Sequence, residues 1–158
     1  MSAFKKKEKE KKISRLSIVI PVLDEDGSLE ETLDSLSRQV RQYRKILVVA
    51  DAMAEQVAES IRKDKLTTVI PAPVGGMAAA LSAGLSAVES PFVAFMRPGD
   101  RVGNVEYYKF CVSYLDKHSD EIDHVTTRTV FRNDLCRKRI PHPTNSVMYW
   151  TDEENEQY

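Results

Sequence analysis

Short apolar runs alternate with segments of helical periodicity along most of this 158-residue chain. The first run, residues 16–22, is nearly continuous and β-branched, which is typical of a strand buried on both faces. Further strands are predicted at 46–49, 67–70, 92–96 and 124–131. Apolar residues three or four apart predict the helices between them, at 28–38, 54–62, 77–88 and 105–118. This rhythm predicts a Rossmann-like α/β domain, a mostly parallel sheet with helices on both faces.

Two of the predicted helices carry recognisable start signals. Ser28 followed by Glu31 forms a capping box. The pair Gly75-Gly76 opens the helix over 77–88. We expect the apolar stripe of that helix to consist of Met77, Leu81, Gly84, Leu85 and Val88.

The composition is that of one soluble globular domain, with 42% apolar residues, 30% charged residues and a net charge of -1. We expect a basic disordered tail at residues 1–14, a globular domain at 15–150 and an acidic tail at 151–158. The charge balance gives no signature of nucleic-acid binding. No run approaches the ~20 apolar residues of a membrane-spanning helix, and no signal peptide is recognisable. We therefore expect a cytoplasmic protein, with contact of the basic tail with the inner face of the membrane as the alternative.

Acidic and glycine residues follow the predicted strands at the points where the strands end. Asp24 and Glu25 come after the first strand and Asp51 after the second. Gly75-Gly76 follows the third, and the sequence from Arg97 to Asp100 follows the fourth. Ligands of open α/β sheets bind outside the carboxyl ends of the strands. Acids there can accept bonds from ribose or base, glycine N–H groups can approach a diphosphate, and Arg97 offers a fixed positive charge.

Each of these features alone has an ordinary structural explanation. Asp24 and Glu25 suit a helix start, where negative charge is favourable. Gly75-Gly76 suits a simple turn, and Arg97-Pro98-Gly99-Asp100 suits a tight turn. Their ordered appearance at four successive strand ends favours a binding site.

Three segments carry a resemblance to family-2 glycosyltransferases of the GT-A fold. They are SIVIPVLDEDGSLEETLDSLSRQ, ILVVAD and VGGMAAALSAGLSAVESPFVAFMRPGD, and the resemblance covers residues 16–115. It implies the nucleotide-sugar-binding half of an inverting transferase that acts in cell-envelope or polysaccharide synthesis. The implied nucleotide-sugar site consists of Pro21, Val22, Asp24, Glu25, Asp51, Gly75, Gly76, Arg97 and Asp100. Within it, the first-strand residues would line the base pocket and Asp51 would contact the base.

The chain departs from the family pattern where the family holds a divalent cation, Mn²⁺ or Mg²⁺. Ala50 replaces the first acid after the second strand, and Arg97 and Gly99 replace both carboxylates of the Asp-x-Asp motif. Asp100 is then the one acid left there as a metal ligand. Two interpretations stay open: the metal site is lost, or the charge of Arg97 substitutes for the cation.

The resemblance also implies that the acceptor-binding half is lacking, because family members continue for about half a domain beyond this point. No acid is marked as the general base, and we expect Asp120, Glu121, Asp123 and Asp134 to be surface charges. The aromatic cluster at 147–150 has two interpretations: a last strand that packs on the core, or a surface that a missing C-terminal half or a second copy of the chain would cover. The alternative function is a non-catalytic, degenerate GT-A module that binds nucleotide or serves in assembly. A phosphoacceptor receiver domain is disfavoured, because no acceptor Asp follows the third strand.

Overall fold

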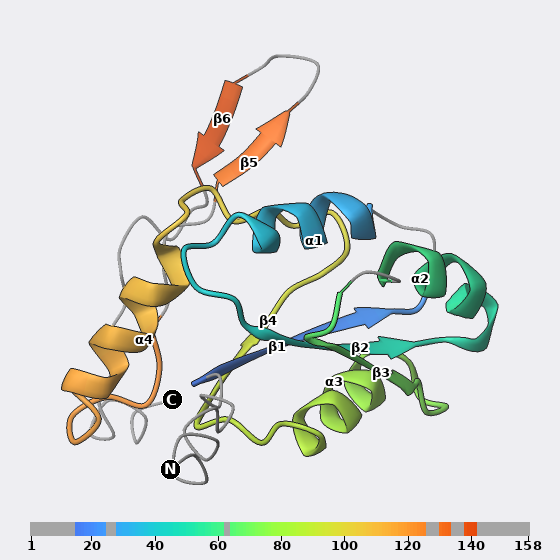
Figure 1. Ribbon diagram of the computed structural model, residues 1–158, viewed down its shortest axis with the longest axis horizontal. Coiled ribbons are helices and arrows are strands. Elements are labelled where there is room, and N and C mark those ends of the chain that lie inside the picture. The colour runs from blue at the N-terminus through green and yellow to red at the C-terminus, as the bar shows by residue number, and fades with distance from the viewer. Residues whose placement is uncertain (1–14, 25–27, 62–63, 126–129, 134–137, 142–158) are drawn as a thin grey trace, which may run out of the picture. The chain divides into compact units, whose positions relative to one another are not determined.

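The computed structural model describes residues 15–24, 28–61, 64–125, 130–133 and 138–141 (Figure 1). Both predicted tails, Glu25, Asp134 and the aromatic cluster at 147–150 lie outside these ranges. The chain forms two compact units, residues 1–109 and 110–158, and each is described by itself.

The first unit is built on a four-stranded, fully parallel sheet. Its strands are β1 (Leu16–Val22), β2 (Arg44–Val49), β3 (Thr67–Pro71) and β4 (Phe92–Phe95), in the spatial order β3-β2-β1-β4. The register pairs Val19 with Ile46 and Phe95, and it pairs Ile46 with Thr68. This arrangement confirms the prediction of a Rossmann-like parallel sheet.

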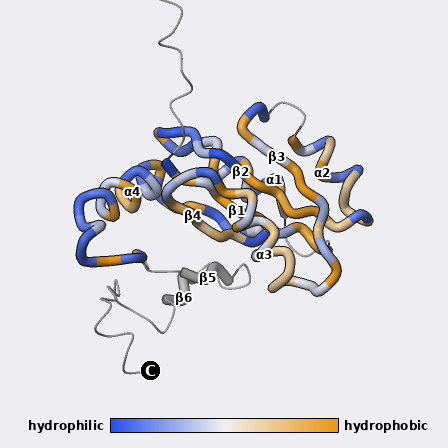
Figure 2. Tube along the Cα trace, turned by 90° about the horizontal axis from the view of Figure 1, so that it is seen from below, coloured by the Kyte–Doolittle hydropathy of each residue, from blue (hydrophilic) through white to orange (hydrophobic). Residues whose placement is uncertain are grey.

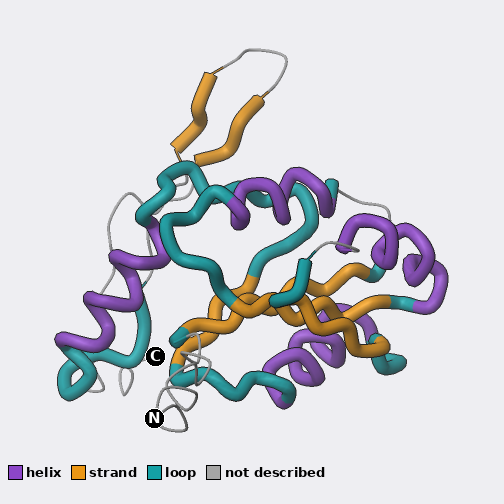
Figure 3. The backbone as a smooth tube through the Cα atoms, viewed as in Figure 1, coloured by secondary structure: helices purple, strands orange, loops and turns teal. Residues whose placement is uncertain are grey.

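Helices cover both faces of this sheet (Figures 1 and 3). The helices α1 (Leu29–Ser37) and α2 (Ala54–Ile61) lie on one face, and α3 (Gly76–Ser86) lies on the other. A 3-10 turn, η1 (Asp51–Met53), joins β2 to α2. All seven residues of β1 are buried, as the sequence predicts for a central strand, and the hydrophobic stretches run through the strands (Figure 2).

Helix α3 packs on the sheet through small residues, which corrects the predicted stripe. Its buried residues are Ala80 and Gly84, whereas Met77 and Leu85 are 39% and 49% exposed. A Cβ atom at Gly84 would lie 2.3 Å from Val19 Cγ1 and 3.0 Å from Val48 Cγ2. The backbone of α3 is therefore too close to the sheet for larger side chains, and these turn outward.

A buried ion pair ties β2 to the segment that enters β3. Lys45 is 4% exposed, and its Nζ atom lies 3.0 Å from Asp64 Oδ2. Burial raises the pKa of Asp64, but bonds from the Leu66 N–H, the Lys45 ammonium and the Thr67 hydroxyl together hold the pKa below its ordinary value. Asp64 is therefore ionised at neutral pH, which satisfies the buried ammonium.

The second unit holds most of α4 (Tyr107–Lys117) and a hairpin of β5 (Val130–Asn133) and β6 (Lys138–Pro141). Of the strand predicted over 124–131, Val130 and Phe131 belong to β5, His124 and Val125 are not in a strand, and residues 126–129 lie outside the described ranges. Strand β5 pairs antiparallel with β6 in a separate two-stranded sheet, so it does not extend the parallel sheet. No helix of the described residues is long and apolar enough to cross a membrane.

Candidate functional site

Apart from Pro21 and Val22, which lie inside β1, the described site residues predicted in the first unit follow the carboxyl ends of its four strands. Because the strands are parallel, these ends lie along one edge of the sheet, with neighbouring strands about 4.8 Å apart. The spatial order β3-β2-β1-β4 sets the sequence along that edge. Gly75-Gly76 follows β3, Asp51 follows β2, Asp24 follows β1 and Arg97 follows β4.

A cavity of about 310 Å³ opens at the ends of β2 and β3. Its walls are Val49 of β2, four residues of α2 and residues 69–71 of β3, and the α2 residues are Ala54, Val57, Ala58 and Ile61. Asp51 is its one ionisable lining residue. Ligand pockets are commonly apolar clefts of this size with a few placed polar groups. We call it the β2–β3 cavity.

Two glycines open α3 in a conformation that other residues rarely adopt. Gly75 has φ +129° and Gly76 has φ +72°, and a Cβ atom at Gly75 would lie 2.9 Å from Ala79 Cβ. Both are exposed, so the first backbone N–H groups of the helix face solvent at the sheet edge. This confirms that the glycine pair opens the helix.

The residues after β4 form a tight turn. The Asp100 N–H donates to Arg97 O at 3.0 Å, and Gly99, after Pro98, has φ +91°, as in a type II turn. Asp100 Oδ2 accepts a bond from the Arg97 N–H at 2.8 Å. The side chain of Asp100 thus closes the turn that carries it.

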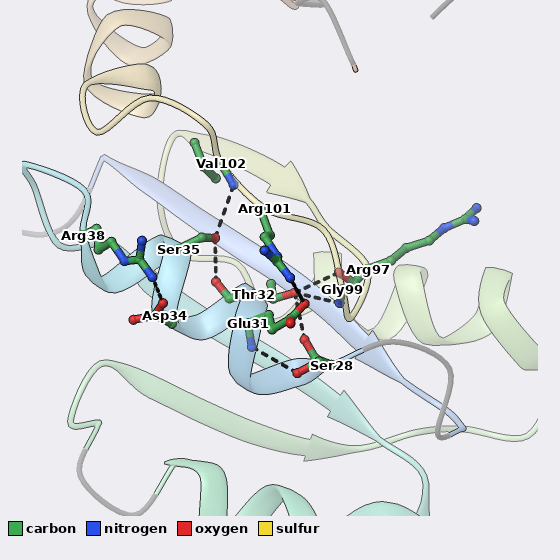
Figure 4. A network of polar contacts seen from close by, with 10 residues as sticks. All are labelled: Ser28, Glu31, Thr32, Asp34, Ser35, Arg38, Arg97, Gly99, Arg101 and Val102. Carbon is green, nitrogen blue, oxygen red and sulfur yellow. Dashed lines mark hydrogen bonds and ion pairs between the residues drawn. The ribbon is translucent and has the colours of Figure 1, made fainter. Parts of the chain in front are cut away.

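Buried polar side chains hold this turn and the segment after it: Thr32 and Ser35 lie in α1 (Figure 4), and Gln39 follows the end of that helix. Thr32 Oγ1 donates to Arg97 O at 3.3 Å and accepts from the Gly99 N–H at 2.9 Å. Ser35 Oγ accepts from the Val102 N–H at 3.2 Å. Gln39 Nε2 donates to Asn104 O at 2.8 Å. All three residues were missed from the sequence, although the spacing of three residues between Thr32 and Ser35 places both on one helix face.

The first-strand residues occupy different environments. Pro21 and Val22 lie inside β1 with buried side chains, so they support the sheet edge from within. Asp24 is exposed directly after the strand. Ser28 caps α1 by accepting a bond from the Glu31 N–H at 3.2 Å, while the Glu31 carboxylate forms an ion pair with Arg101.

The donor set for a divalent cation is poor along this edge. Divalent cations of this kind prefer several oxygen ligands, mostly carboxylates. In the part of the chain that the structure describes, no three Asp, Glu, His or Cys side chains gather where they could hold a metal ion. Asp100 is exposed and uses one carboxylate oxygen to close its own turn. The described residues therefore do not fit the metal that the family pattern implies.

The described residues form an α/β fold of the Rossmann-like type, with a row of polar residues at the carboxyl edge of its parallel sheet. The family model for glycosyl transferase family 2 matches residues 17–152, and the chain belongs to that family. A search of the curated proteins found no match.

Solved structures with the same fold come from two kinds of enzyme. The crystal structure of S. aureus TarS 1-349 matches with a TM-score of 0.57 at 22% identity, over 66% of this chain and 33% of that chain. Its complex with UDP matches with a TM-score of 0.55 at 21% identity, over 66% and 32%. A 4-diphosphocytidyl-2C-methyl-D-erythritol synthase from Anaerococcus prevotii matches with a TM-score of 0.55 at 15% identity, over 87% and 70%. This chain thus spans about a third of the length of the TarS structures.

Proposed function

We propose that this chain binds the nucleoside diphosphate of a nucleotide sugar and serves a glycosyl transfer in cell-envelope or polysaccharide synthesis. The observation that carries the proposal is the β2–β3 cavity, which places Asp51 beside apolar walls at the ligand-binding edge of the sheet. Membership of glycosyl transferase family 2 supports the same class of donor.

In this proposal the nucleobase enters the mouth of the β2–β3 cavity. Apolar walls suit the faces of a planar base, and the exposed carboxylate of Asp51 accepts a bond from a base N–H group. The UDP complex of TarS supports uracil as the first base to test. Asp24, which follows the neighbouring strand, is the proposed ribose contact.

The diphosphate is proposed to lie between the start of α3 and Arg97. The backbone N–H groups behind Gly75 and Gly76 donate to phosphate oxygens, which the glycine conformation leaves accessible. In an inverting transfer, the acceptor hydroxyl attacks the anomeric carbon while the bond from that carbon to the diphosphate oxygen breaks. Negative charge then grows on the departing nucleoside diphosphate, and fixed donors at this edge stabilise it.

The acceptor site and the general base are proposed to lie outside the described residues, in further chain or in a second copy. The described acids of the second unit support this, because Asp120, Glu121 and Asp123 are exposed, as expected for surface charges. Glu121 Oε2 lies 3.4 Å from His118 Nδ1, a contact within one surface turn.

A second candidate function is nucleotide binding without transfer. Ala50, Arg97 and Gly99 stand where the family pattern has acids, which favours a module that retains the nucleotide and has lost the reaction. The two functions differ in one measurable product. Release of UDP from a UDP-sugar in the presence of acceptor indicates transfer, whereas binding without release indicates the module.

Calorimetric titration with UDP, GDP, CDP and dTDP tests the proposed site. We expect one of the four to bind, and we expect Asp51→Asn to weaken it by about 10- to 100-fold, the range for loss of a bond to a charged group. The matched control is Asp34→Asn, since Asp34 is an exposed acid of α1 that pairs with Arg38. Binding that is equal in Asp51→Asn and Asp34→Asn would contradict the assignment of the base to this cavity.

A further inference from the structure

The turn after β4 offers a positive charge where the family pattern has a metal-binding motif. Arg97 leaves the sheet directly after Met96, whose N–H donates to Val19 O of the central strand at 3.1 Å. Arg97 therefore stands at the ligand-binding edge, beside the strand that ends before Asp24. Its position along the edge is set by the sheet itself.

The backbone at Arg97 is held from two sides. Within the turn, its N–H is bound by Asp100 and its carbonyl accepts from the Asp100 N–H. From α1, the hydroxyl of Thr32, which is fully buried, also donates to that carbonyl. A charged side chain on a fixed backbone loses less conformational freedom when a ligand binds.

The guanidinium itself extends away from this network (Figure 4). Arg97 is exposed, and within the described residues its guanidinium takes part in no ion pair. By contrast, Arg101 in the same segment is bound to Glu31. Arg97 therefore presents an uncompensated guanidinium, a planar group that binds phosphate oxygens through two parallel N–H bonds.

We propose that Arg97 takes the place of the divalent cation, so that this chain binds a nucleoside diphosphate without metal. The inference rests on the proposed nucleotide site and names the group that neutralises its diphosphate. The lack of metal ligands among the described residues supports the same inference. The acid that remains in the motif, Asp100, accepts a hydrogen bond from the Arg97 N–H. Asp100 thereby helps to position Arg97.

The test is calorimetric titration of UDP into the full chain, with EDTA and with added Mn²⁺. We expect the dissociation constants in the two conditions to agree within about twofold. Arg97→Ala should weaken UDP by about 10- to 100-fold, the range for bonds between charged groups. Arg97→Lys should fall between the wild type and Arg97→Ala, because it keeps the charge and loses the paired N–H geometry.

Two controls separate the phosphate contact from a general effect on the chain. Arg101→Ala removes a positive charge from the same segment and should leave UDP affinity unchanged. Uridine, which has no phosphate, should bind wild type and Arg97→Ala equally. Arg97→Ala should also unfold at the temperature of the wild type, since the side chain is exposed.

The outcomes distinguish this inference from the function on which it rests. Loss of UDP binding in EDTA and its return with Mn²⁺ would overturn the role of Arg97 and leave the nucleotide site intact. Equal UDP affinity in Arg97→Ala and wild type would overturn it as well. Absence of binding by UDP, GDP, CDP and dTDP in every condition would overturn both proposals.

Discussion

Gly84 sets the distance between α3 and the sheet. Its position would place a Cβ atom within 2.3 Å of Val19 Cγ1, a separation at which one of the two groups has to move. Val19 is fully buried in β1, the strand that precedes the polar row at Asp24. The absence of a side chain at Gly84 therefore sets how closely α3 packs against β1 and β2. This helix also carries the proposed phosphate-binding start.

We predict that Gly84→Ala destabilises the protein by about 2 kcal/mol. Overpacking costs about 1–3 kcal/mol, and the better helix propensity of Ala returns up to about 1 kcal/mol. The contact at Gly84 is unusually short, which places the overpacking at the upper end of its range. The free energy of unfolding from urea denaturation measures the effect.

The matched control is Gly103→Ala, because a Cβ atom at Gly103 meets nothing within 4 Å. We expect that variant to unfold at the urea concentration of the wild type or slightly above it. Equal midpoints for Gly84→Ala and Gly103→Ala would contradict the close packing of α3.

At the scale of elements, α1 connects the two sides of the candidate site. Its start follows β1 at the sheet edge, and its buried residues Thr32 and Ser35 bind the backbone of the segment after β4. That segment is irregular, so its N–H and C=O groups find their partners in side chains of α1 in place of a strand. Thr32 makes two of these bonds, because its hydroxyl donates to the Arg97 carbonyl and accepts from the Gly99 N–H.

We predict that Thr32→Val loosens the turn at Arg97–Asp100. Valine keeps the shape of threonine, but it removes the hydroxyl that accepts from the Gly99 N–H and donates to the Arg97 carbonyl, so Ser28 O alone accepts from that N–H. The net contribution of a hydrogen bond is about 0.5–1.5 kcal/mol. Amide hydrogen exchange at Gly99 should become faster. UDP affinity should fall, because Arg97 loses part of its support.

Thr32→Ser keeps the hydroxyl and serves as the control. We expect its exchange rate at Gly99 to stay close to that of the wild type. An unchanged rate in Thr32→Val would show that Ser28 O, which also accepts from the Gly99 N–H at 3.0 Å, is sufficient to hold the turn.

Element positions could be predicted from the sequence better than element contacts. The cap at Ser28 and the bounds of α1 follow from local signals, and the structure agrees with both. The predicted stripe of α3 was correct at Gly84 and Val88 and wrong at Met77 and Leu85. Periodicity indicates which residues share a face and does not indicate how near the sheet lies. The buried role of Thr32 was missed, since its bonding partners are 65 and 67 residues away along the chain.

At the scale of the whole molecule, the order of parallel strands brings separate parts of the sequence to one edge. The alternation of predicted strands and helices along the sequence was enough to predict that edge and most of the polar residues on it. The β2–β3 cavity could not be predicted, because it depends on how α2 packs beside the strand end at Pro71. The partner and direction of the fifth strand, predicted over 124–131, could not be predicted for a related reason. Thr and Val content favours a strand, but the strand's partner and direction depend on pairing with β6.

The central claim is that a nucleoside diphosphate binds at the carboxyl edge of this sheet. Its most direct test is an NMR titration of ¹⁵N-labelled protein with UDP, or with whichever nucleotide the calorimetry selects. The account predicts that the amide signals of Asp51, Gly75, Gly76 and Arg97 shift together with one dissociation constant, while those of α4 stay in place. Shifts confined to other parts of the chain, or no shift at any nucleotide concentration, would contradict it.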